Sequence, residues 1–364
     1  MQDAHHTRAR LTELLAERIL VLDGAWGVLL QGRGLSEDEF RGERFRDHPR
    51  DVRGDPDLLN LTQPQIVSEV HRAYLEAGAD ITTTNTFTAT SIGQGDYGLQ
   101  EAVYEMNVAG ARLAKEATAD YEDRFVAGSV GPLNVTLSLS PKVEDAAFRS
   151  VTFDQVVEAY AEQIRGLRDG GADLLLIETI FDTLNAKAAI AAAKDVAPDL
   201  PIWLSVTIVD RSGRTLSGQT IEAFWISVAH ADPVIVGVNC SLGASEMRPY
   251  VEDLARVAPI PTACYPNAGL PNAFGGYDET PEITCELLTA FAADGLVNLV
   301  GGCCGTGPEH IAAIAASVRE LPTRVIPEPA DDSFPTFSGL EPFRIRPDTG
   351  FVTIGERQNV TGSA

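Results

Sequence analysis

Short apolar runs alternate with longer segments of helical periodicity along most of the chain. Eight runs have the character of buried strands, and each ends among glycine, asparagine or acidic residues. These runs are residues 19–27, 79–87, 124–132, 172–180, 201–209, 233–241, 261–269 and 297–305. The segments of helical length between them are residues 64–77, 99–119, 152–169, 183–195, 220–229, 244–257, 280–293 and 308–319.

This alternation predicts a parallel sheet covered by helices, because strands that are buried on both faces are apolar throughout. Eight such units over about 300 residues predict a (β/α)8 barrel, the TIM-barrel fold of the α/β class. The two GAD triplets, at 78–80 and 171–173, fit glycines that end the preceding helices. A doubly wound sheet is the alternative, but no G-x-G-x-x-G sequence follows the first strand.

Composition and charge narrow the class of protein. Hydrophobic residues make up 44 % of the 364 residues, but no apolar run approaches the ~20 residues that a membrane helix needs. The formal charge of −24 argues against binding to nucleic acid or to an anionic membrane surface. Residues 1–20 have an amphipathic helical pattern and no secretory signal. We therefore expect a soluble cytoplasmic protein whose partners are small molecules or other proteins.

The cysteines do not fit a disulfide scaffold, since they are odd in number and widely spaced. Cys264 lies within a predicted strand and Cys285 on a predicted helix, and we interpret both as packing residues. Cys303 and Cys304 are adjacent. Neighbouring residues cannot easily reach the Cα separation of about 5.5 Å that disulfides prefer. The pair therefore calls for another function.

Three cysteines are predicted to meet at one mouth of the barrel. Cys240 ends the sixth strand, and Cys303 and Cys304 end the eighth. Chemistry in TIM barrels takes place at the C-terminal ends of the strands. Three thiolates with one open position suit catalytic zinc. Successive residues of a regular strand point to opposite faces, so both members of the pair can bind one ion only if the backbone turns, which the flanking glycines permit.

Two other interpretations of these residues are weaker. The stretch GGCCGTG could form a glycine-rich phosphate cradle at a helix start, but no GK[ST] sequence follows. A histidine-based zinc hydrolase is disfavoured, because the six histidines fall outside the predicted strand ends.

Two acidic residues, Asp23 and Glu178, stand at the ends of the first and fourth strands. Each could cap the helix that follows, or face the pocket and bind a cation. If the cysteines hold a metal, an ammonium group of the substrate would satisfy both carboxylates. That combination points to an amino acid with a soft donor atom.

Seven stretches together carry a family resemblance. They resemble the homocysteine-binding barrel of the zinc-dependent homocysteine S-methyltransferases over residues 11–325. The stretches are LDGAWG, TNTF, GSVGP, IETI, GVNCS, PNAGLPN and GGCCGT. The resemblance implies that Cys240, Cys303 and Cys304 are the zinc ligands.

The resemblance also places Asp23 and Glu178 near the polar groups of the amino acid, and Asn267 near the metal. Gly24, Asn85 and Ser129 stand at the ends of the first three strands and complete the expected substrate site.

The C-terminal residues suggest a particular branch of the family. A Pro-rich linker, residues 326–350, precedes FVTIGERQNVTGSA at 351–364, which is similar to the start of the pterin-binding barrel in cobalamin-dependent methionine synthases. The resemblance implies a homocysteine-binding zinc barrel at 1–325. It also implies cobalamin-binding and pterin-binding modules in the same polypeptide.

The expected reaction is methylation of homocysteine. Its thiolate attacks the methyl group of methylcobalamin and forms methionine. One alternative is a stand-alone methyltransferase that uses betaine or S-methylmethionine. A non-enzymatic alternative is a zinc-storing or redox-sensing module in which the adjacent cysteines cycle between dithiol and disulfide.

Overall fold

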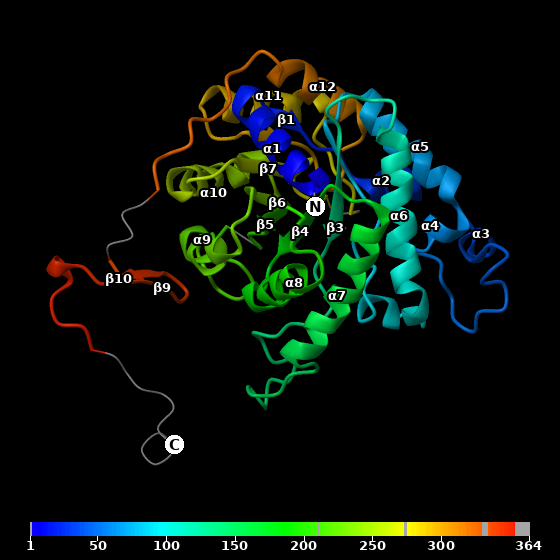
Figure 1. The fold of residues 1–364 in the computed structure, drawn as a ribbon, viewed down its shortest axis with the longest axis horizontal. Coiled ribbons are helices and arrows are strands. Elements are labelled where there is room, and N and C mark those ends of the chain that lie inside the picture. Colours follow the sequence, from blue (N-terminus) through cyan, green and yellow to red (C-terminus); the bar gives the residue numbers. More distant parts are fainter. Residues whose placement is uncertain (1, 210, 273–274, 330–333, 354–364) are drawn as a thin grey trace.

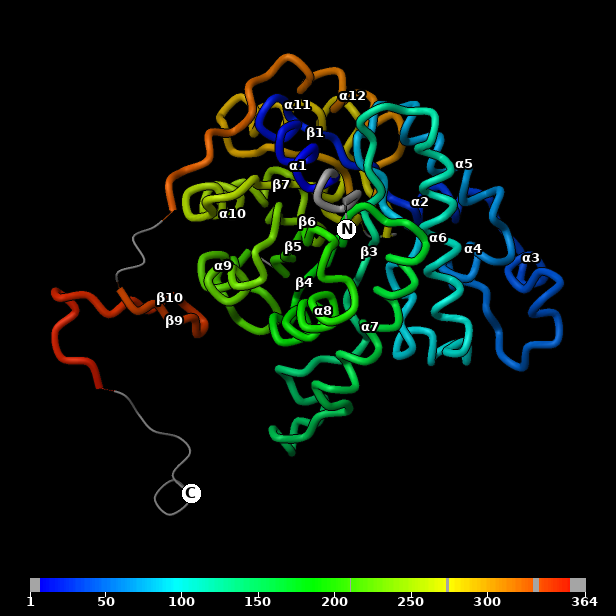
Figure 2. Tube along the Cα trace, viewed as in Figure 1, coloured from blue at the N-terminus to red at the C-terminus, as the bar shows by residue number. Residues whose placement is uncertain are grey.

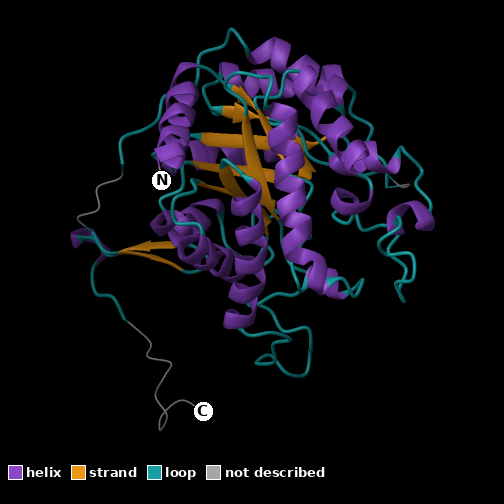
Figure 3. Ribbon diagram, turned by 45° about the vertical axis from the view of Figure 1, so that its right-hand side comes forward, coloured by secondary structure: helices purple, strands orange, loops and turns teal. Residues whose placement is uncertain are grey.

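The computed structural model describes residues 2–209, 211–272, 275–329 and 334–353. Across these ranges, eight parallel strands form a sheet that helices surround (Figure 1; Figure 3). The strands are β1 (Leu20–Val21), β2 (Ile81–Thr83), β3 (Phe125–Val130), β4 (Leu174–Ile180), β5 (Ile202–Val206), β6 (Ile235–Gly243), β7 (Thr262–Asn267) and β8 (Leu299–Val300). Seven of them fall inside the predicted apolar runs, and β6 extends two residues beyond the run predicted at 233–241.

The sheet closes into a barrel. Its strand order, β1-β8-β7-β6-β5-β4-β3-β2, leaves β1 and β2 at the two ends. A parallel bridge between Leu22 and Ile81 joins those ends. Two backbone hydrogen bonds support the bridge, from Asp80 N to Val21 O at 2.7 Å and from Asp23 N to Ile81 O at 3.0 Å. The predicted (β/α)8 barrel is confirmed. The pairing that closes it, between the ends of β1 and β2, is a single bridge, whereas the other strand pairs share at least two paired positions.

Helices follow every strand and cover the outside of the barrel. The main series comprises α5 (Pro64–Glu76), α6 (Val103–Thr118), α7 (Phe153–Gly170), α8 (Thr183–Val196), α9 (Ile221–Val228), α10 (Ala244–Val257), α11 (Pro281–Ala293) and α12 (Pro308–Val318). The others are α1 (Gln2–Glu17), α2 (Trp26–Gln31), α3 (Glu37–Arg41) and α4 (Leu59–Thr62), with short 3-10 turns at Gly93–Gly95, Gln100–Ala102, Ala229–Ala231 and Pro347–Thr349. Of the helices that the structure describes, none is long and apolar enough to cross a bilayer.

Helix starts have local causes in the sequence. Thr152 accepts a hydrogen bond from the backbone of Gln155 and forms a capping box at the start of α7. Asp182 caps α8 in the same way, through the backbone N–H groups of the first turn. Helices α5, α11 and α12 begin with proline, whose missing N–H is not needed there.

Two apolar layers hold the barrel together. Alternate strand residues such as Leu174 and Leu176 point into the barrel, where they pack with Trp203 and Tyr265. Their neighbours, such as Leu175, pack outward against the helices. The amphipathic N-terminal segment forms α1, which contributes buried leucines to the inner layer: Leu11, Leu14 and Leu15.

The C-terminal segment folds back on the barrel. Strands β9 (Thr336–Ser338) and β10 (Pro342–Arg344) form an antiparallel hairpin beside α9 (Figure 2). The Ser338 hydroxyl donates to Ala223 O at 2.6 Å, and Gln219 Nε2 donates to Gly339 O at 2.9 Å. The predicted linker, 326–350, thus contains a docked hairpin. Of the predicted start of a second barrel, residues 354–364 lie outside the described residues.

Candidate metal and substrate site

Three thiols converge at the C-terminal mouth of the barrel. Cys240 comes from β6, and Cys303 and Cys304 follow β8. Their sulfur atoms all lie within 4.8 Å of one another, and Cys240 Sγ is 3.9 Å from Cys304 Sγ. All three side chains are partly buried. Cys264 and Cys285 lie elsewhere, the first fully buried on β7 and the second on α11.

A tight turn allows both adjacent cysteines to face the same point. Thr306 N donates to Cys303 O at 3.1 Å, which closes a β-turn over 303–306. Gly305, the third residue of the turn, has a φ of 84°, a conformation that type II turns require and that glycine adopts without strain. A Cβ at this position would lie 2.5 Å from Cβ of Tyr277. The turn therefore requires glycine for two independent reasons.

Bulges at the ends of β4 and β6 aim the other site residues. Pairing slips between Asn239 and Gly243 of β6, and Cys240 there has a φ of 61°. Pairing also slips after Ile177 of β4, where Thr179 has a φ of 56°. Left-handed backbone at residues other than glycine costs of order 1–3 kcal/mol and gathers at functional sites.

Asn239 ties the two bulges together. Its Oδ1 accepts from Thr179 N at 3.1 Å and from the Ser205 hydroxyl at 2.7 Å, and its Nδ2 donates to Thr179 Oγ1 at 2.9 Å. The side chain is fully buried. Asn239 therefore fixes the ends of β4 and β6 relative to each other, and with them Glu178 and Cys240.

The sulfur positions fit zinc. With Zn–S bonds of ~2.3 Å, tetrahedral geometry places two thiolate sulfurs about 3.8 Å apart. The Cys240–Cys304 separation of 3.9 Å matches that value. Three cysteine ligands leave a fourth position for substrate.

Hydrogen bonds among the three thiols also shift their pKa values in opposite directions. Hydrogen bonds from Cys240 and then Cys303 lower the pKa of Cys304, so this sulfur carries the negative charge most readily. Hydrogen bonds with Cys240 and then Cys304 raise the pKa of Cys303. The cluster is thus prepared to bind a cation.

Asp23 lies buried beside β2. Its Oδ2 accepts from Thr83 N at 2.7 Å and from the Thr82 hydroxyl at 3.0 Å. These bonds tie the carboxylate to β2 and leave the N-terminus of α2 uncapped by a side chain. Burial raises the pKa of Asp23 to about 7, although these hydrogen bonds oppose the shift; the charge of Glu178 raises it further.

Glu178 forms the second buried acid of the site. Its Oε1 accepts from the Ser129 hydroxyl at 2.6 Å. Burial raises its pKa to about 7, and the charge of Cys304 adds to the shift. Among the described residues, neither Glu178 nor Asp23 has a basic partner. Two carboxyl groups and three thiols therefore share a buried region that lacks a balancing cation.

The raised pKa of Asp23 predicts a pH-dependent stability. Its pKa is 3.8 in an unperturbed chain and about 7 in the folded protein. Its contribution is therefore fully present below about pH 4 and is lost as the pH rises through about 7, by up to ~1.4 kcal/mol per pH unit. Urea unfolding of the chelator-treated parent protein and of Asp23→Asn, from pH 4.5 to 8, measures this contribution. As the pH rises to about 7, the unfolding free energy of the parent should fall relative to that of Asp23→Asn. Parallel curves for the two proteins would contradict the assignment.

The remaining predicted site residues have different surroundings. Asn267 Oδ1 accepts from Cys304 N at 3.1 Å and so supports the cysteine turn. Gly24 lies under Thr306, where a Cβ would come within 2.7 Å of the Thr306 carbonyl. The Asn85 side chain instead donates to Pro56 O at 2.6 Å, in the segment before α4. The structure thus brings Asn267 and Gly24 to the thiols and directs the Asn85 amide to another contact.

Two tyrosines of the site were not predicted from the sequence. Tyr277, in the connection between β7 and α11, interacts with Cys304 and lowers the pKa of that thiol. Tyr265 on β7 is fully buried near Glu178, where it partly opposes the burial that raises the pKa of that acid. In the sequence, Tyr265 could have been identified from its position on the same strand, two residues before the predicted site residue Asn267. No local pattern pointed to Tyr277.

Comparisons with known proteins agree with this geometry. The family model described as homocysteine S-methyltransferase matches residues 20–318. The homocysteine methyltransferase MmuM from Escherichia coli, in its metallated form, is 25 % identical, with a TM-score of 0.66 over 84 % of this chain and 99 % of that chain. Its oxidized form is 24 % identical, with a TM-score of 0.64 over 82 % and 95 % of the two chains.

Proposed function

Because the chain belongs to the homocysteine S-methyltransferase family, we propose that it methylates the sulfur of homocysteine with a methyl group from methylcobalamin and forms methionine. The observation that carries the proposal is the cluster of Cys240, Cys303 and Cys304 beside two buried acids. The thiols suit a metal that binds sulfur. The acids suit the ammonium group of an amino acid.

Each part of the site has a role in this reaction. The three cysteines would hold zinc, which lowers the pKa of a thiol bound to it. Asp23 and Glu178 bind and orient the ammonium group of homocysteine, and Ser129 holds Glu178 in place. In the transfer, the homocysteine thiolate forms a bond to the methyl carbon while the bond from that carbon to the donor breaks. The thiol proton passes to solvent before attack, which makes the sulfur nucleophilic, and the electron pair of the broken bond stays with the donor.

Exposed side chains near the mouth of the barrel support the proposal that another protein module carries the methyl donor to the site. After six of the strands, one large apolar side chain in the following loop or first helical turns is 37–46 % exposed: Val28, Phe87, Leu139, Leu184, Leu216 and Leu270. Exposed apolar side chains grouped around a site are typical of surfaces that contact another protein. The similarity of residues 351–364 to a pterin-binding barrel also supports cobalamin as the methyl carrier.

A stand-alone enzyme is the second candidate. The match covers 99 % of the MmuM chain, so this barrel contains the whole fold of a homocysteine methyltransferase. Such an enzyme would accept the methyl group directly from a small donor such as S-methylmethionine or betaine.

Parallel assays with three methyl donors distinguish the two candidates. With zinc and homocysteine, we expect slow methionine formation from free methylcobalamin, and none above background from betaine or S-methylmethionine. The rate is low because free methylcobalamin lacks the millimolar effective concentration that a tethered module provides. Faster turnover with either small donor would contradict the proposal that methylcobalamin is the methyl donor. It would not affect the assignment of the three cysteines as the metal site. Chelator-treated protein is the control.

A further inference from the structure

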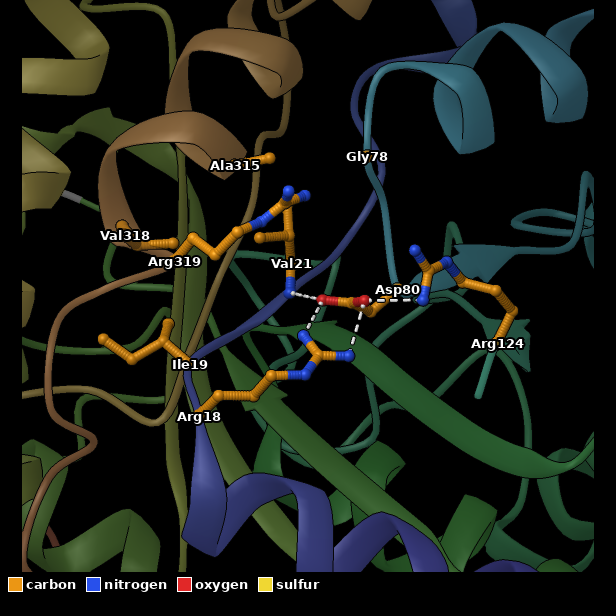
Figure 4. A pocket seen from close by; sticks show the side chains of 9 residues that line it. All are labelled: Arg18, Ile19, Val21, Gly78, Asp80, Arg124, Ala315, Val318 and Arg319. Atoms are coloured by element: carbon orange, nitrogen blue, oxygen red, sulfur yellow. Dashed lines mark hydrogen bonds and ion pairs between the residues drawn. The ribbon is translucent and has the colours of Figure 1, made fainter. Parts of the chain in front are cut away.

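A cavity lies at the opposite end of the barrel from the thiols. It has a volume of about 270 Å³ (Figure 4). Its walls come from the N-terminal ends of β1, β2 and β3 and from the end of α12, and they are formed by Arg18, Ile19, Val21, Gly78, Asp80, Arg124, Ala315, Val318 and Arg319. The reaction proposed above uses none of these residues.

Positive charge exceeds negative charge in this cavity. Arg18, Arg124 and Arg319 contribute three guanidinium groups, and Asp80 contributes the single carboxylate. The excess of two positive charges stands out in a chain of net charge −24. Asp123, an acid close enough to influence Arg18, is already paired with Arg10 at 2.6 Å.

Asp80 has no capacity left for a further cation. Its two oxygens accept from Arg18 at 2.8 and 2.9 Å, from Arg124 at 2.9 Å and from Val21 N at 3.0 Å. A carboxylate offers about four acceptor positions, and these bonds occupy them. The third guanidinium, that of Arg319, therefore has no carboxylate in the cavity lining with which to pair.

Donor groups around the cavity lack acceptors. Arg124 Nε is buried and has no hydrogen-bond partner in the described part of the chain. Arg319 makes no side-chain hydrogen bond or ion pair with the residues that the structure describes. The two guanidinium groups lie on either side of the Asp80 carboxylate (Figure 4). For the buried Arg124 Nε, the missing acceptor costs about 1–3 kcal/mol, which an oxyanion in the cavity would offset; Arg319 is exposed and would supply a second, unpaired guanidinium group.

We propose that this cavity binds a phosphate group, either inorganic phosphate or a phosphate monoester. At neutral pH a phosphate group carries about −1.5 to −2 charges, which matches the excess of two arginines. Its oxygens accept the paired N–H groups of arginine. The volume of about 270 Å³ is several times the ~30 Å³ of a water molecule, so a phosphate group fits.

A bound phosphate would join parts of the barrel at its closing seam. Arg18 and Val21 precede and form β1, Arg124 precedes β3, and Arg319 follows α12. A bridge between Leu22 and Ile81 joins β1 to β2 at this point. Phosphate contacts across these elements would therefore stabilise closure of the barrel. The chain then continues from Val21 to Asp23 in the homocysteine site.

Titration calorimetry and thermal unfolding of the full chain test the proposal. The probes are inorganic phosphate, glycerol phosphate and sulfate, each at constant ionic strength with chloride as the background. We expect saturable binding of one phosphate or one phosphate monoester per chain and a rise in Tm with concentration. The tighter of the two phosphate ligands identifies the source of the group.

Arg319→Gln is the decisive variant, because Arg319 is exposed and its loss leaves the Asp80 ion pairs intact. Loss of one charged hydrogen-bonding partner should weaken phosphate binding by about tenfold or more. Arg46→Gln removes an equal charge from the segment between α3 and α4 and should bind like the parent. Absence of saturable binding, or equal affinity in Arg319→Gln and the parent, would overturn the proposal. A Tm rise that chloride alone reproduces would do the same.

Discussion

Replacing Cys303 with alanine should abolish tight zinc binding and reduce kcat/KM for methionine formation by more than about 10³-fold. Changes to residues that merely support metal ligands already cost about 10–100-fold in metal affinity or activity, and loss of a ligand should cost more. Two sulfurs within 4.8 Å of each other would remain, which is too few for a stable site. Metal analysis after dialysis and a methionine assay measure the two effects. Cys240→Ala and Cys304→Ala should behave alike.

The matched control for these variants is Cys285→Ala. Cys285 is a partly buried cysteine on α11 whose thiol donates to Ala313 O at 3.3 Å. Its loss should leave about one zinc per chain and near-parental activity. If Cys303→Ala retains zinc while Cys285→Ala loses it with the fold intact, the metal site has been assigned to the wrong cysteines.

Glu178→Gln should lower kcat/KM for homocysteine by about 10²-fold or more and leave zinc content unchanged. Removing one partner of a buried charge pair costs about 3–5 kcal/mol, and here the pair is Glu178 with the substrate ammonium. Glutamine can still accept from the Ser129 hydroxyl through its carbonyl oxygen. The variant therefore tests the charge more than the fold.

A thiol without the amino group sharpens this test. The parent should bind homocysteine far more tightly than 4-mercaptobutanoate, and calorimetry on zinc-loaded protein should show a much smaller difference in Glu178→Gln, where only Asp23 remains to bind the ammonium group. Glu286→Gln, at an exposed position on α11, serves as the charge-matched control. Unchanged discrimination in Glu178→Gln would mean that the ammonium group binds elsewhere.

Periodicity along the chain was sufficient to predict the barrel. The helix expected at 183–195 is Thr183–Val196, and the one expected at 280–293 is Pro281–Ala293. The convergence of Cys240 with Cys303 also followed from the sequence, because the carboxyl ends of parallel strands meet on one rim of a barrel. The positions of strands and helices could be predicted from local sequence, because a strand buried on both faces is apolar throughout and proline is common at helix starts.

The tertiary structure decided how side chains at the strand ends point. The bulges that place Cys240 and Glu178 depend on the register between neighbouring strands, and nothing in either strand alone shows the slip. Asn85 stands at a strand end like Ser129, yet its amide bonds to Pro56 while Ser129 bonds to Glu178. The sequence gives the order of such residues along the rim, but their contacts arise only when the elements pack.

Groups that are remote in the sequence were likewise assembled by the fold. The cluster of Arg18, Asp80 and Arg124 with Arg319 joins the two ends of the barrel sequence at the closing seam. Tyr277 reaches Cys304 because its loop crosses the end of β8. By itself the sequence determined which segments are strands and helices, since that depends on near neighbours. Charge balance, burial of single polar groups and the shape of the arginine-lined cavity depend on distant residues, and only the packed barrel brings those together.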